Sequence, residues 1–172
     1  GCGELYCGER LAAENTCSDI PLGIQRDVPL TTFTDVGFRV CHRSGYTTET
    51  PLDGILNGCG GDQMVIGCIR DGGDLLALAA GANRADVLMD VGTGREASHE
   101  VDGVAWYYSS QSSWGFAPAG QSLARNNCDT SNDGDNGETR MCWHTGRGNL
   151  ETGFRCGTTT TYNRLERMIL VR

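Results

Sequence analysis

The sequence has no lysine, no closely spaced cysteine pair and no long hydrophobic run. All 14 basic residues are arginine, so the only primary amine is at the N-terminus and lysine-directed cross-linking is excluded. No CxxC pair is present, which argues against a zinc knuckle. The longest apolar run, residues 75–82, is far shorter than the roughly 20 residues that cross a bilayer, so no membrane insertion is expected. No N-x-S/T glycosylation sequon and no GxSxG nucleophile motif occurs either.

The charge of the chain excludes another class of partner. Fourteen basic residues stand against 22 acidic ones, and the net charge is −8. Affinity for nucleic acid comes largely from the counterions that a basic surface releases, and this composition does not provide such a surface. No nucleic-acid partner is therefore expected. With 172 residues, 38% of them hydrophobic, the chain is long enough to close one core.

The cysteines are the most informative residues that are present. There are nine, dispersed along the whole chain, and dispersed cysteines predict disulfides rather than metal ligands. A disulfide framework in turn predicts an extracellular protein, either secreted or at the cell surface. Because nine is an odd number, at least one sulfur is left for a free thiol or for a bond to another chain.

Six of the cysteines lie in the β-rich part of the chain, and three lie before it. In the larger group we expect three disulfides, with Cys68 joined to Cys41 or Cys59. Another disulfide is expected between two of the last three, Cys128, Cys142 and Cys156. The unpaired sulfur, free or bonded between chains, is then expected in the first group, Cys2, Cys7 and Cys17.

Turn-forming residues divide the chain into an arm and one β domain. Residues 1–30 show little apolar periodicity, and Pro21 and Pro29 mark the exit from this N-terminal arm. In residues 31–172, short apolar runs alternate with glycine-rich and polar clusters, as strands and turns do. The expected strands are residues 37–42, 64–70, 75–80, 85–90, 103–109, 114–117, 139–144, 153–156 and 167–171, with one short helix at 50–56. The prediction is an all-β, antiparallel β-sandwich, jelly-roll-like and stapled by disulfides.

Several long motifs in residues 36–172 carry a resemblance to a known type of module. They are Arg84-Ala85-Asp86-Val87-Leu88, Gly103-Val104-Ala105-Trp106-Tyr107-Tyr108, Ser113-Trp114-Gly115-Phe116-Ala117-Pro118-Ala119-Gly120, Arg125-Asn126-Asn127-Cys128-Asp129-Thr130, Arg140-Met141-Cys142-Trp143-His144-Thr145 and Gly153-Phe154-Arg155-Cys156-Gly157. This pattern resembles a module of multidomain secreted and cell-surface proteins, many of them bacterial. The resemblance implies an extracellular module and no assigned activity. It does not extend to the arm.

The segment from residue 129 matches the first half of a calcium-binding loop. Oxygen-bearing side chains stand at alternating positions with a glycine at the sixth, and the candidate ligands are Asp129, Ser131, Asp133 and Asp135. The second half departs from the pattern, because the twelfth position holds Arg140 where a bidentate glutamate is needed. Calcium is the one cofactor that the sequence suggests. The alternative is an acidic hairpin loop rich in Asn-Gly and Asp-Gly turns.

Zinc is not expected, although two short segments bring cysteine close to histidine. Neither Cys41-His42 nor Cys142-Trp143-His144 has the ligand spacing of a zinc site. A sulfur that is already part of a disulfide also cannot bind a metal.

Aromatic residues crowd into one part of the chain. Strand alternation places Tyr107 on the face opposite Trp106 and Tyr108. An exposed ring beside polar side chains suits a sugar, whose C–H face stacks on the ring and whose hydroxyls need hydrogen-bond partners. The expected ligand-binding residues are Tyr107, Tyr108, Trp114, Arg125 and His144. The alternative is that the three tryptophans, Trp106, Trp114 and Trp143, form the core of the sandwich.

No catalytic constellation stands out, so we expect no enzyme. The chain is interpreted as a non-enzymatic extracellular recognition or adhesion module, whose partner is a glycan or a cell-surface or matrix protein. One alternative is a structural subunit of an extracellular filament or matrix that self-associates through the arm. The other is a secreted hydrolase, which would need a cleft that brings His99 or His144 to a serine or a carboxylate.

Overall fold

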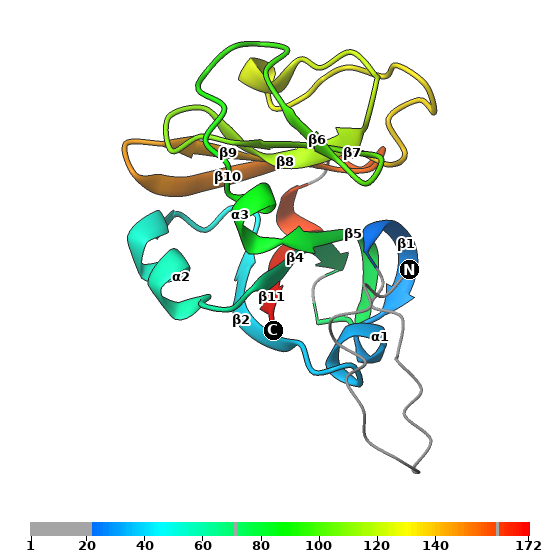
Figure 1. Ribbon diagram of the computed structural model, residues 1–172, viewed down its shortest axis with the longest axis vertical. Coiled ribbons are helices and arrows are strands. Elements are labelled where there is room, and N and C mark those ends of the chain that lie inside the picture. Colours follow the sequence, from blue (N-terminus) through cyan, green and yellow to red (C-terminus); the bar gives the residue numbers. More distant parts are fainter. Residues whose placement is uncertain (1–21, 71, 161) are drawn as a thin grey trace, which may run out of the picture.

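The computed structural model describes residues 22–70, 72–160 and 162–172, and within them two antiparallel sheets face each other (Figure 1). In spatial order, the first sheet contains β1 (Gly23–Pro29), β5 (Leu75–Asn83), β4 (Gln63–Arg70), β11 (Leu165–Val171) and β2 (Arg39–Gly45). The second contains β3 (Thr50–Pro51), β10 (Asn149–Cys156), β9 (Met141–Gly146), β8 (Ser113–Pro118), β7 (Val104–Tyr108) and β6 (His99–Val101). The predicted all-β antiparallel sandwich is therefore confirmed.

The two sheets are connected differently. From β6 to β10 the second sheet is a meander in which each strand pairs with the next one in the chain. The first sheet is assembled from distant segments, and its centre pairs β4 with the C-terminal strand β11. The likeness to a jelly roll thus lies in the two facing antiparallel sheets rather than in the order of their strands. Short helices occupy the connections: α1 (Thr31–Thr34), α2 (Leu52–Gly58), α3 (Arg84–Val87), η1 (Arg125–Asn127) and η2 (Tyr162–Arg164).

The main core lies between the sheets and is rich in tryptophan. Trp106, Trp114 and Trp143 are buried there, and the rings of Trp114 and Trp143 pack edge to face with centroids 5.3 Å apart. From the first sheet, alternate residues such as Ile66 and Ile169 pack against them. The interpretation of the tryptophans as the core of the sandwich is confirmed.

The outer face of each sheet is also covered. Phe33 of α1 and Phe38 pack edge to face over the first sheet, where they bury Val65 and Leu170. The 119–140 connection covers the second sheet and buries Tyr107 in a smaller core (Figure 1). Because both faces of β4 are covered, six consecutive residues of this strand are buried and the apolar run hardly alternates.

The expected boundary of the β domain and the expected start of the helix were wrong. β1 falls inside residues 1–30, yet it pairs with β5 along its length and buries Val28, so the sandwich begins before the predicted boundary. Pro29 is tolerated there because β1 is an edge strand. The predicted helix at residues 50–56 starts later, at Leu52, with Pro51 before it and no side-chain cap. Residues 1–21, with Cys2, Cys7 and Cys17, lie outside the described residues.

The predicted strand at residues 85–90 is also wrong, because the chain turns there into α3. Leu88 N–H donates to Arg84 O at 3.1 Å, which closes one helical turn after β5. The Arg84 side chain donates to the carbonyls of Cys59 at 3.0 Å and Leu56 at 3.3 Å. These contacts with the end of α2 hold the turn in place.

The six cysteines of the sandwich form three disulfides, Cys41–Cys59, Cys68–Cys156 and Cys128–Cys142. The expectation that two of the last three cysteines pair is confirmed. The expected partner of Cys68 is wrong, because β2 and the end of α2 bring Cys41 and Cys59 to each other with Cα atoms 5.2 Å apart. Cys68 of β4 instead joins Cys156 of β10 and links the two sheets. Three disulfides indicate an oxidising environment.

No helix within the described part of the chain has the length and apolar composition needed to span a membrane.

The sheet-to-sheet disulfide should contribute most to stability. It closes a loop with a sequence separation of 88, against 14 for Cys128–Cys142. In the chain-entropy model the disulfides that close these loops stabilise the folded protein by about 4–5 and about 3 kcal/mol, respectively. The double variant C68A/C156A should therefore lower the free energy of unfolding more than C128A/C142A does, measured by urea denaturation at one pH. Equal losses, or the opposite order, would show that unfolded-chain entropy does not set the ranking.

Candidate functional site

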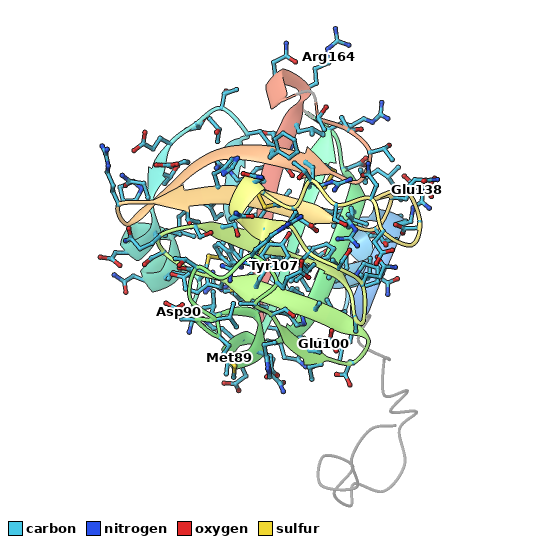
Figure 2. The ribbon with its side chains drawn as sticks, turned by 90° about the horizontal axis from the view of Figure 1, so that it is seen from above. Met89, Asp90, Glu100, Tyr107, Glu138 and Arg164 are labelled. Atoms are coloured by element: carbon cyan, nitrogen blue, oxygen red, sulfur yellow. A yellow bond between two sulfur atoms is a disulfide. The ribbon has the colours of Figure 1, made fainter. Side chains whose placement is uncertain are left out.

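A cleft of about 750 Å³ opens at one end of the sandwich, where the chain crosses from the second sheet to the first. Clefts of this size, lined by both apolar and polar groups, are the usual place for small ligands. Figure 2 shows Arg164 on the periphery of the molecule, on the side opposite Met89 and Asp90. The lining residues are Arg70 and Ala77 from the first sheet, Cys156 from the second, and Thr159, Asn163, Arg164 and Leu165 from the connection and the start of β11.

Strand alternation carries Arg70 into this cleft. Met64, Ile66 and Cys68 of β4 face the core between the sheets, and Arg70 is the next residue of the same row. Arg70 also lies opposite Leu165 in the ladder, and Leu165 faces the same core. The row reaches solvent at its end, so its last member can carry a charge. The candidates taken from the sequence do not include Arg70, although its position two residues after Cys68 puts it on the core-facing row of β4.

One wall of the cleft is a tight turn fixed at both ends. Cys156 N–H donates to Thr159 O at 3.0 Å, and Thr159 N–H donates to Cys156 O at 3.1 Å. The disulfide from Cys156 to Cys68 ties this turn to β4 in the opposite sheet. A covalent bond therefore limits how far the two sides of the cleft can separate.

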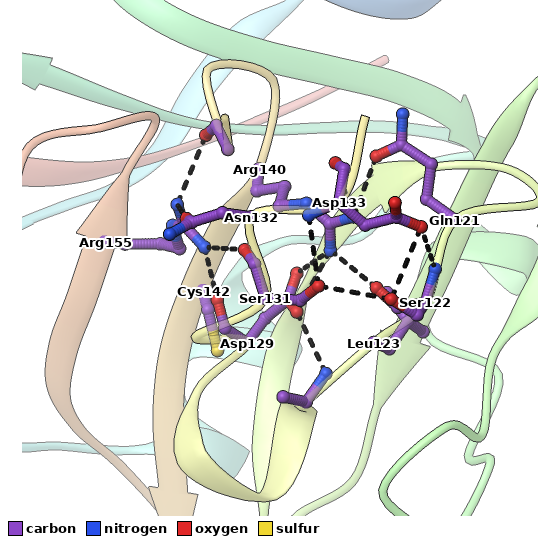
Figure 3. Close-up of polar contacts among 12 residues, drawn as sticks. Gln121, Ser122, Leu123, Asp129, Ser131, Asn132, Asp133, Arg140, Cys142 and Arg155 are labelled. Carbon is purple, nitrogen blue, oxygen red and sulfur yellow. Dashed lines mark hydrogen bonds and ion pairs between the residues drawn. The ribbon is translucent and has the colours of Figure 1, made fainter. Parts of the chain in front are cut away.

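The side chain of Arg155, the residue before Cys156, also supports this turn. Its guanidinium donates to five oxygens: those of Gly157 at 3.0 Å, Ser131 at 2.7 Å, Asn132 Oδ1 at 3.2 Å, Gly137 at 3.4 Å, and the Asp129 carbonyl (Figure 3). Burial lowers the pKa of Arg155, while the Asp129 carboxylate opposes this effect. The turn and the 129–137 loop are thus joined through one buried cation.

Arg140 occupies the predicted calcium loop. It donates to both carboxylate oxygens of Asp129, at 2.9 and 3.1 Å, and the two side chains are fully buried. It also donates to Ser122 O at 3.0 Å, Gln121 Oε1 at 2.8 Å and Asp133 O at 3.2 Å (Figure 3). The residue that breaks the calcium pattern at position twelve therefore supplies the cation of the loop.

The other predicted calcium ligands are engaged by separate protein donors. Ser131 Oγ accepts from Asp133 N–H at 3.3 Å, Asp133 Oδ2 from Ser122 N–H at 2.9 Å, and Asp135 Oδ1 from Gly137 N–H at 3.1 Å. The bond from Ser122 lowers the pKa of Asp133. Within residues 22–70, 72–160 and 162–172, no three His, Cys, Asp or Glu side chains are grouped to hold a metal. The structure thus places the Arg140 guanidinium, bonded to Asp129, in the loop for which calcium was expected, and calcium binding stays a prediction.

The predicted ligand-binding residues do not form a surface. Tyr107, Trp114 and Arg125 are fully buried, while Tyr108 and His144 are half-buried. Strand alternation does place Tyr107 opposite its neighbours, but the 119–140 connection covers that face as well. The expectation of exposed rings was therefore wrong for Tyr107 and Trp114, because both faces of the second sheet are covered.

Two of these residues contact each other and support the covering loop. The guanidinium of Arg125 lies 5.5 Å from the ring centre of Tyr107 and donates to Ser113 Oγ at 3.3 Å. Tyr107 donates its hydroxyl to Met141 O at 2.9 Å, and burial raises its pKa well above the usual value. His144 lies farther along β9 with its ring against Phe154, and burial lowers its pKa. These contacts stabilise the fold.

The pairs that a hydrolase would need lie outside the cleft. His99 Nε2 lies 2.8 Å from Asp86 Oδ1, which is within hydrogen-bond distance, but neither residue lines the cleft. His42 Nε2 lies 2.9 Å from Ser44 Oγ on β2, and this pair was not among the sequence-based candidates. Ser44 Oγ also accepts from the buried Arg167 at 3.1 Å. Burial lowers the pKa of Arg167 to about 10.

The cleft itself carries positive charge. Arg70 and Arg164 are exposed, and neither has an ion pair or a side-chain hydrogen bond among the described contacts. By contrast, Arg26 pairs with Glu138 at 2.6 Å, and Arg43 pairs with Glu166. The lining thus combines the guanidinium groups of Arg70 and Arg164 with the amide of Asn163, the hydroxyl of Thr159 and apolar side chains.

Comparison with known proteins gives no relative. No protein-family model, no curated protein and no solved structure matches the chain. The resemblance to a secreted module therefore stays a prediction, and function can be inferred only from the geometry of the cleft and of the loops behind it.

Replacing Arg155 by lysine should destabilise the protein although the charge is kept. An ammonium is a single point with three donors and cannot reach the oxygens that the planar guanidinium contacts, so buried carbonyls are left without partners. We expect R155K to cost about 2–4 kcal/mol in urea unfolding, since each buried unsatisfied group costs about 1–3 kcal/mol. The control is R26K, whose side chain is 50% exposed and whose loss should be below about 0.5 kcal/mol. Similar losses in both variants would contradict the role assigned to Arg155.

Proposed function

We propose that the chain is a non-enzymatic extracellular recognition module that binds a glycan in the cleft beside η2. The observation that carries this proposal is the mixed lining of the cleft. Asn163 and Thr159 offer an amide and a hydroxyl, and Arg70 and Arg164 offer guanidinium donors. Sugar hydroxyls need such closely spaced hydrogen-bonding groups.

The apolar part of the lining supports the same class of ligand. Ala77, Leu165 and the disulfide-bonded Cys156 contribute surface without hydrogen-bonding side chains. A sugar presents C–H groups on its ring faces and hydroxyls around its rim, so one apolar wall with polar neighbours is complementary to it. The buried aromatic rings make the cleft a better candidate than the strand faces.

The disulfides support a secreted or cell-surface location. All six cysteines of the sandwich are paired, which requires an oxidising compartment during folding. Proteins in that setting meet glycans and matrix proteins, the partners expected from the sequence. A secreted hydrolase is the weaker proposal, because the pairs at His99 and His42 lie outside the cleft lining.

A second candidate is a structural subunit of an extracellular filament or matrix. β1 is the first described strand and forms an edge of the first sheet, so one side of its backbone has no strand partner in the described chain. Such an edge is where chains join by strand addition or exchange. This candidate requires association between copies, which the recognition module does not.

Deletion of residues 1–21 distinguishes these candidates. This deletion leaves β1 in place, whereas removal of residues 1–30 would also take away a strand that pairs with β5. A recognition module should keep its glycan affinity and its monomer mass in light scattering after the shorter deletion. Loss of higher assemblies with no glycan binding before or after deletion would favour the structural subunit.

A glycan array tests the proposed binding function. The folded, oxidised protein should bind a limited set of saccharides, and N163A should weaken binding to each of them about fivefold or more, since it removes one polar contact. The control is N57A, an exposed asparagine on α2 that does not line the cleft. Equal effects of both variants, or no binding to any glycan by the wild-type protein, would overturn the proposal.

A further inference from the structure

The arginine side chains of this protein differ in whether they form hydrogen bonds or ion pairs. Most donate to carbonyls or carboxylates, and four of those that the structure describes have no side-chain hydrogen bond or ion pair: Arg70, Arg95, Arg147 and Arg164. All four are exposed. Two of them, Arg70 and Arg164, line the same cleft. In the ladder Arg70 lies opposite Leu165, the residue next to Arg164, so β4 and η2 bring the two close together.

Among the described residues that line the cleft, none is acidic and could neutralise these two cations. Glu166 is close in sequence but belongs to the other face of β11, since successive residues of a strand alternate. It accepts hydrogen bonds from Arg43 and from Gly72 N–H at 3.2 Å, and the bond from Arg43 lowers its pKa. Its charge is therefore already compensated. The positive charge of the cleft remains available to a ligand.

We propose that the ligand in this cleft is an acidic saccharide whose anionic group binds between Arg70 and Arg164. This inference rests on the proposed glycan-binding function and specifies its substrate class. Guanidinium groups form two parallel charge-assisted hydrogen bonds with planar or tetrahedral oxyanions, which lysine cannot reproduce. Asn163 and Thr159 lie beside them for the neutral hydroxyls of the same sugar. The anionic group is a carboxylate, as in uronic acids, or a sulfate ester.

The overall charge makes this local arrangement selective. With a net charge of −8 the surface as a whole repels polyanions, so affinity for an anion must come from directed contacts at short range. Nucleic acid needs a basic stripe along many phosphates, and two arginines in one cleft do not supply it. A single acidic group on an otherwise neutral sugar suits the cleft better.

Calorimetric titration of the full, oxidised chain with four probes tests this inference. The probes are trigalacturonic acid, a sulfated chondroitin disaccharide, neutral maltotriose and sodium sulfate. We expect binding of at least one acidic saccharide and none of maltotriose. R70Q/R164Q should weaken that binding about tenfold or more, because hydrogen bonds to charged groups are the stronger ones. R70K/R164K should restore only part of the affinity.

The matched control is R95Q/R147Q. It removes two exposed, unpartnered arginines and changes the net charge equally, but neither residue lines the cleft. Its affinity should stay within about twofold of the wild-type value if the contacts are local. Equal losses in R95Q/R147Q and R70Q/R164Q would mean that only overall charge matters, and this would overturn the proposed site.

The remaining outcomes separate this inference from the proposed function. Binding of maltotriose as tight as that of the acidic probes, unchanged by R70Q/R164Q, would overturn the acidic class and keep glycan recognition. Binding of sodium sulfate that depends on Arg70 and Arg164, without binding of any saccharide, would support the anion site and overturn the glycan function. Binding of none of the four probes would overturn the inference.

Discussion

The buried guanidinium groups of Arg140 and Arg155 hold together the part of the protein that strand pairing does not reach. The 119–140 connection contains no strand, so its buried carbonyls need other donors. Burying a charge costs several kcal/mol unless nearly all of its hydrogen bonds are made, and the oxygens of the loop provide them. The fit is tight at Gly137, whose φ is +81° and where a Cβ would lie 1.9 Å from Arg155. Loop and cations therefore depend on each other.

This dependence explains why the aromatic residues are structural. Once the connection is fixed over the outer face of the second sheet, Tyr107 has no solvent face, while the tryptophans are buried on the inner face by the first sheet. The same happens on the first sheet under Phe33. Because other segments cover both outer faces of the sandwich, neither sheet presents its strand faces to solvent. The cleft lies at one end of the sandwich, where the chain crosses between the sheets.

Local patterns in the sequence predict much of the fold. The short apolar runs of β4 and β7 and the turn residues between strands were enough for the sandwich, and the number of disulfides followed from counting the cysteines of the β-rich part. The features of the fold that these local patterns could not predict depend on contacts between residues that are distant in the sequence. The bond from Cys68 to Cys156 requires the order of strands in both sheets, and the contact of Arg140 with Asp129 requires the shape of a loop. The calcium pattern gave no sign of this contact, although carboxylates attract a guanidinium as they attract a metal ion.

The candidate site was harder to predict than the fold, since it is built from residues that the fold does not use. Arg70 and Arg164 satisfy no buried group, so nothing in the packing requires arginine at either position. The wall beside them is different, because Cys156 is bonded to Cys68 and Arg155 holds the adjacent Gly157 carbonyl. Ligand binding at a preformed wall costs little ordering entropy, which leaves more of the contact energy for affinity. Substitution of Arg70 or Arg164 should therefore change the charge of the cleft while the fold stays the same.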